Sequence, residues 1–126
     1  MTIDQHLLHS IILPSAKRKL HDYTDFRWQF PVVADHVLIR LILELTTAKS
    51  EKIIAGQISR ELAALGYRCQ KEELLQFVTD MAHIFRREVA VTMLMYDMQE
   101  NGYPEQEIIN IVSQGFGGRK PLYVVN

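Results

Sequence analysis

Apolar residues recur along most of the chain at the three- and four-residue spacing of one face of an amphipathic helix. Strand-like alternation occurs only near 26–30 and 122–125. This pattern predicts an all-α fold, a single-domain bundle of about five helices over 1–118, with a flexible or strand-like tail over 119–126. The predicted helices cover 2–13, 31–48 and 70–100, with two more running from Ser50 to Gly66 and from Pro104 to Gly115.

Local signals set the predicted ends of these helices. Pro14 marks the end of the first helix because proline lacks the backbone N–H that a helix interior needs, although the basic segment 15–21 can add one further turn. Pro31 suits the first turn of a helix, and the side chain of Ser50 can cap the next one. Gly66 can adopt the left-handed conformation that ends a helix.

The predicted helix 70–100 is the longest, and its apolar residues cover more than one narrow stripe. They are Leu74, Leu75, Phe77, Val78, Met81, Ala82, Phe85, Val89, Met93, Met95 and Met98. A helix that is apolar over much of its circumference is usually central in a bundle or buried in an oligomer. Because methionine adapts to irregular or exchangeable apolar surfaces, we expect part of this helix to contact a second copy in a homodimer.

Composition and charge narrow the class of protein. The chain has 126 residues, and its 14 Lys and Arg against 15 Asp and Glu leave a net charge of −1, so no overall positive charge favours a general nucleic-acid binder. Cys69 is the only cysteine, which excludes an intrachain disulfide framework and a zinc site made of several cysteines. A reducing, cytoplasmic setting fits best. We expect no signal peptide, because Asp4 stands where a positive region should be and the basic run 17–19 follows the apolar stretch. We expect no membrane span, because Arg40 and Glu44 interrupt the richest apolar stretch.

Candidate catalytic groups are weakly supported. His6 and His9 share a helix face, as do Asp80 and His83, but neither pair belongs to a metal-binding motif such as HExxH. Cys69 lies between basic residues before a helix start, which could lower the pKa of its thiol. A lone cysteine in an interhelical turn is more often inert. The glycines at 115–118 lack the strand before and the helix after that a phosphate-binding loop requires. We therefore expect no catalytic residues, no metal and no cofactor.

The stretch 53–78 has the helix, turn and helix of a DNA-binding unit. Such a unit would place Arg68, Gln70 and Lys71 against the nucleic acid. Glu72 and Glu73 follow directly, however, and would meet the phosphate backbone unfavourably. The sequence therefore favours a helical hairpin within the bundle and leaves DNA binding as the alternative.

Segment 17–31 gathers basic and aromatic residues. Because 26, 28 and 30 alternate as in a strand, their rings can cover the bundle, contact a protein partner or stack on single-stranded nucleic acid. Together with methionines of the long helix and apolar residues near the C-terminus, this segment supplies the candidate partner-binding residues. They are Lys17, Arg18, Lys19, Phe26, Arg27, Trp28, Phe30, Met95, Met98, Phe116, Leu122 and Tyr123.

These observations lead by elimination to a function in macromolecular binding. We expect a small non-enzymatic regulatory or adaptor protein that acts through protein–protein contacts, for example on transcription. The alternative is a dimeric helix-turn-helix-like DNA-binding regulator that uses 53–78 and the basic segment 17–27.

Overall fold

The protein is all-α, as the hydrophobic pattern predicts. The computed structural model describes residues 2–22 and 34–117, and no strand occurs within those ranges. The elements are α1 (Ile3–Leu7), the π-helical segment η1 (Leu8–Ile12), α2 (Leu13–Asp22), α3 (Asp35–Leu45), α4 (Glu51–Ala64), α5 (Lys71–Ile84), α6 (Arg86–Glu100) and α7 (Glu105–Gly117). The first three follow one another without interruption and form one N-terminal rod, so the described residues contain six helical rods where the sequence predicts about five.

The prediction that Pro14 ends the first helix is wrong. The rod continues through Pro14 to Asp22. Pro14 has no N–H to donate to the carbonyl of Ser10, and the wider turns of η1 lie just before it, where they can accommodate the ring. Tertiary contacts hold the continuation in place, since Leu13, Ser15 and Ala16 are all buried.

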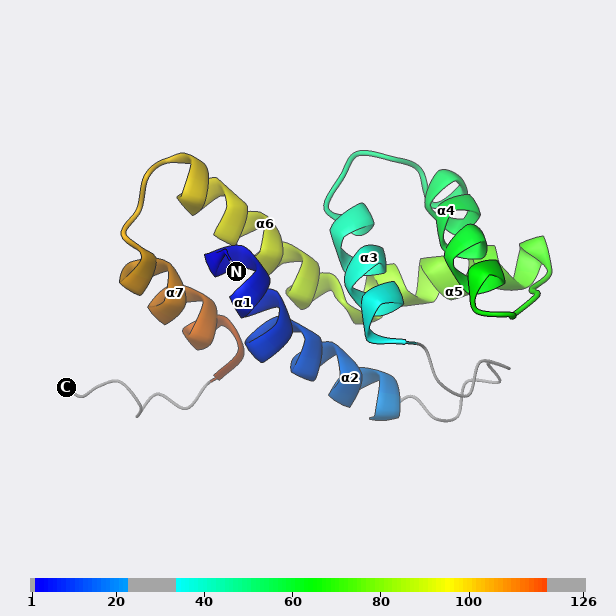
Figure 1. The fold of residues 1–126 in the computed structure, drawn as a ribbon, viewed down its shortest axis with the longest axis horizontal. Helices are drawn as coiled ribbons and strands as arrows, with labels where there is room; N and C mark the ends of the chain where they lie inside the picture. Colours follow the sequence, from blue (N-terminus) through cyan, green and yellow to red (C-terminus); the bar gives the residue numbers. More distant parts are fainter. Residues whose placement is uncertain (1, 23–33, 118–126) are drawn as a thin grey trace.

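The prediction of one helix over 70–100 is also wrong, because the chain breaks at Phe85. Phe85 has φ −94° and ψ 18°, outside the α-helical region, and its ring is fully buried. Figure 1 shows that α5 and α6 run in different directions on either side of this residue. The break lets α5 pack against α4 while α6 packs against α7 and η1.

The helices gather at two ends of the molecule. Figure 1 shows α3, α4 and α5 at one end, and the N-terminal rod with α6 and α7 at the other. Contacts of α3 with α2 and α6, and of α5 with α6, join the two ends. One continuous set of buried apolar residues runs through both, with Phe77 and Phe85 among the largest fully buried side chains.

The predicted helix signals at Ser50 and Gly66 are confirmed. Ser50 Oγ accepts a hydrogen bond from the backbone N–H of Ile53 at 3.3 Å, which caps α4. Gly66 has φ 93°, and the N–H of Tyr67 then donates to the carbonyl of Leu62 at 2.9 Å. None of the helices within 2–22 and 34–117 is long and apolar enough to cross a membrane.

Candidate partner-binding surface

Lys19, one of the candidate partner-binding residues, has an internal partner instead. Its Nζ lies 2.9 Å from Oε1 of Glu88, which is fully buried at the start of α6. Ser15 Oγ donates to the other carboxylate oxygen of Glu88 at 2.6 Å. A buried carboxylate needs such partners, so this group joins α2 to α6 and leaves Lys19 little freedom to bind another protein.

Met95 and Met98 are not surface residues, contrary to the sequence prediction. Both belong to the core, because they lie on the side of α6 that faces the N-terminal rod and α7. Their neighbours Met93 and Leu94 are 48% and 44% exposed. Some apolar residues of 70–100 are therefore not part of the core. Met93 and Leu94 in α6 and Leu75 in α5 lie on the surface.

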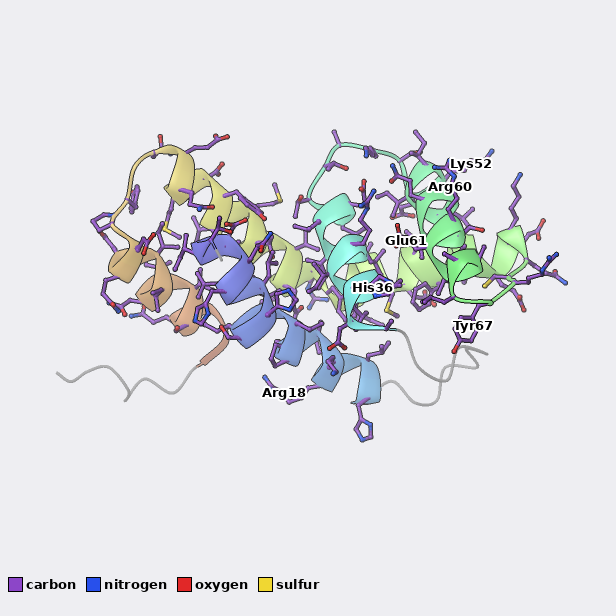
Figure 2. The ribbon with its side chains drawn as sticks, in the orientation of Figure 1. Arg18, His36, Lys52, Arg60, Glu61 and Tyr67 are labelled. Atoms are coloured by element: carbon purple, nitrogen blue, oxygen red, sulfur yellow. The ribbon has the colours of Figure 1, made fainter. Side chains whose placement is uncertain are left out.

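Other candidate residues fall into two groups. Lys17 is exposed and forms an ion pair of 3.1 Å with Asp35 at the start of α3. Figure 2 shows Arg18 on the side of α2 away from α3, where its guanidinium meets solvent. The rest lie outside the described residues, as does the side chain of Phe116: Phe26, Arg27, Trp28, Phe30, Leu122 and Tyr123.

The predicted DNA-binding unit corresponds to α4, the connection 65–70 and α5. This connection is longer than the turn of about three to four residues in a helix-turn-helix unit. Arg68, Gln70 and Lys71 are exposed, but so are Glu72 and Glu73 in the same region. The two acidic side chains suit the positive end of α5 and oppose an approaching phosphate backbone.

The outer side of α4 is exposed, and most of its residues are apolar or small. We call it the α4 face; it comprises Lys52, Ile53, Gly56, Arg60, Ala63 and Ala64. Ile53 is 54% exposed, and a Cβ added at Gly56 would meet no atom within 4 Å. A solvent-facing helix surface normally carries mostly polar and charged side chains, which only Lys52 and Arg60 supply here. Figure 2 shows these two residues on α4, with Tyr67 beyond its C-terminal end.

Polar contacts fix α4 against both neighbouring helices. On the side of α5, the hydroxyl of Thr79 donates to Glu51 Oε1 at 2.7 Å. On the side of α3, Glu44 binds Lys49 Nζ at 2.8 Å, just before α4 begins. The hydrogen bond from Lys49 lowers the pKa of Glu44 despite the opposing effect of burial, so the carboxylate stays charged at neutral pH. Polar contacts therefore hold the start of α4, the helix that carries the α4 face, next to α3 and α5.

Two further exposed apolar side chains belong to the same pair of packed elements. Leu65 directly follows α4, and Leu75 lies on α5, the helix packed beside it. Both are exposed. Exposed large apolar residues are ordinary when scattered, but Ile53, Leu65 and Leu75 all belong to one pair of packed helices. Exposed apolar residues therefore gather on this helix pair, as Met93 and Leu94 do on α6.

The residues considered for catalysis gain no support. Burial, and then the charge of Glu73, raise the pKa of the Cys69 thiol, opposite to the lowering that its basic neighbours suggested. Less thiolate forms at neutral pH as a result. His6 and His9 are exposed on the N-terminal rod. In the described part of the chain, no group of three His, Cys, Asp or Glu side chains is placed to hold a metal ion.

Sequence reasoning missed both the α4 face and the buried Glu88. The signal for the first was the spacing of Lys52, Gly56 and Arg60, which puts a glycine between two cations on one helix side. The signal for the second was a glutamate in register with the apolar positions of Phe85 and Met95. Compared with known proteins, the chain matches no protein-family model, no curated protein and no solved structure.

Proposed function

We propose that this protein is a non-enzymatic regulatory or adaptor protein that binds another protein through the α4 face. One observation carries the proposal: the exposed side of α4 is apolar or small over most of its length, with Ile53 at one end and Ala63 and Ala64 at the other. A binding partner that covers this side would remove apolar surface from water, which favours association by about 25 cal/mol per Å².

The chemistry of the α4 face favours a helical partner. Gly56 and Ala63 have little or no side chain, so the backbone of a second helix can approach α4 closely there. Lys52 and Arg60 lie four residues before and after Gly56 on the same helix side. A matching partner segment is therefore an amphipathic helix whose apolar stripe is bordered by acidic residues and packs directly against α4.

The test uses substitutions at Gly56, where nothing in the chain is displaced. The wild-type protein serves as bait in an extract of its own organism, and the captured protein is then titrated with each variant by calorimetry. Gly56→Glu obstructs the close approach and should weaken binding at least about tenfold, or about 1.4 kcal/mol. Gly56→Ala adds one methyl group and should retain binding within about threefold.

Two controls complete this experiment. Gln5→Glu introduces the same charge on the exposed side of the N-terminal rod and should leave the affinity unchanged. If Gly56→Glu binds the captured protein as tightly as the wild type does, the α4 face is not the binding surface. The same preparations are titrated with duplex DNA at low salt. Tight binding that Arg68→Ala and Lys71→Ala abolish would replace this proposal with the DNA-binding alternative.

A further inference from the structure

A second exposed surface runs along α6. Arg86, Ala90, Met93 and Asp97 are all exposed and follow one another at spacings of four, three and four residues. This is the spacing of the core positions in a coiled coil. We call these four residues the α6 seam. The opposite side of α6 carries Thr92, Met95 and Met98, which are buried within the chain.

The α6 seam combines an apolar centre with oppositely charged ends. Met93 is 48% exposed, and Leu94 beside it is 44% exposed. Arg86 is the first residue of α6, while Asp97 lies in its last turn. The Asp97 carboxylate has no side-chain partner within the described ranges. The Arg86 guanidinium uses Nη1 for the carbonyl of His83 at 3.3 Å, which leaves its other N–H groups available.

We infer that the α6 seam pairs with the α6 seam of a second copy of this chain in an antiparallel, two-fold arrangement. Each residue then faces the one at the same distance on the other side of the helix centre. Arg86 lies opposite Asp97 of the second copy, and Ala90 lies opposite its Met93. The two charge pairs attract, and the small Ala90 leaves room for the long side chain of Met93.

Charge selects this arrangement over the parallel one. Parallel pairing would set Arg86 against Arg86 and Asp97 against Asp97, and both contacts would repel. Within the monomer, Asp97 lies near the negative end of α6, where the helix dipole disfavours a carboxylate. The antiparallel dimer offsets this cost by placing the Arg86 guanidinium of the second copy beside the Asp97 carboxylate.

The dimer is expected to be weak and concentration-dependent. One exposed side of a 15-residue helix buries less than the roughly 800 Å² per partner of a standard interface. Sedimentation velocity across a wide range of protein concentrations should therefore show a monomer–dimer equilibrium for the full chain. A protein that stays monomeric at the highest concentration overturns the inference.

Charge reversal tests the pairing itself. Arg86→Asp alone places two aspartates opposite each other, and Asp97→Arg alone does the same with two arginines. Each single variant should dimerise about tenfold more weakly than the wild type. An equimolar mixture of the two variants should recover the wild-type affinity, because every facing pair in that heterodimer is again opposite in charge.

This design separates pairing from folding. Both reversals put a charge where the helix dipole favours it, so circular dichroism should show both variants fully helical. Gln5→Glu on the exposed side of the N-terminal rod is the control, and its dimerisation should equal that of the wild type. A mixture that dimerises no better than either variant alone refutes the antiparallel seam. Partner binding through the α4 face is measured separately, so the two proposals can fail independently.

Discussion

The buried ion pair between Lys19 and Glu88 offers the sharpest test of how this fold is held together. Replacing Lys19 by Met keeps the length of the side chain and removes its ammonium group. Glu88 then remains fully buried with the hydroxyl of Ser15 as its one remaining side-chain partner. Burying the Glu88 carboxylate costs solvation free energy, which its two partners offset. When one partner is lost, part of that cost is no longer offset and the folded state is destabilised.

The size of the effect follows from burial. Removing one partner of a fully buried pair costs about 3–5 kcal/mol. Lys19 is 35% exposed, so solvent already screens part of the interaction and water can replace some of it. We therefore expect Lys19→Met to lower the free energy of unfolding by about 2 kcal/mol. For a chain of this size, that corresponds to a melting temperature lower by ~8 °C.

The assay is urea unfolding followed by circular dichroism, performed as a double-mutant cycle. Glu88→Gln removes the charge and keeps an oxygen that can accept from Ser15. The double variant should lose less stability than the two single changes added together, by about 1–2 kcal/mol. If Lys19→Met costs under about 0.5 kcal/mol, or if the two changes are additive, Glu88 does not depend on Lys19 and the reasoning fails.

Two other predictions concern local packing and titration. Gly56→Ala should stabilise the protein by about 0.5–1 kcal/mol through helix propensity, because the added Cβ meets no atom within 4 Å. Gly115→Ala should give no gain, since its Cβ would lie 3.0 Å from Cγ2 of Val91; equal stabilisation of both variants in urea titrations would contradict this packing. Burial, followed by the nearby Asp4 carboxylate, raises the pKa of Tyr96 from 10.0 to about 12. Because the folded state holds this proton more tightly than the unfolded chain, the contribution to stability is complete below pH 10.0 and disappears as the pH rises toward about 12. Tyr96→Phe should remove that loss, and an ultraviolet titration that shows every tyrosine ionising near pH 10.0 would disprove it.

The surface properties of this chain were only partly readable from its sequence. The sequence predicts one helix over 70–100 with several methionines near its end, and spacing alone gives the same weight to Met93, Met95 and Met98. Burial separates them, because α7 and the N-terminal rod pack on one side of the helix and leave the other side open. The candidate interface consequently moved from the buried methionines to the exposed Met93 and its neighbours on the same helix.

The sequence by itself determined the all-α class and the signals at Ser50 and Gly66. These signals are local, because a capping hydroxyl and a glycine with positive φ each affect only the few residues next to them in the sequence. Only the tertiary structure decided that the first rod continues past Pro14 and that the long helix breaks at Phe85. Both outcomes depend on tertiary contacts with residues far along the chain: Ser15 donates a hydrogen bond to Glu88, and the ring of Phe85 is buried in the core. The energy of these contacts exceeds the local cost of a proline or a bend, and no short window of sequence contains it.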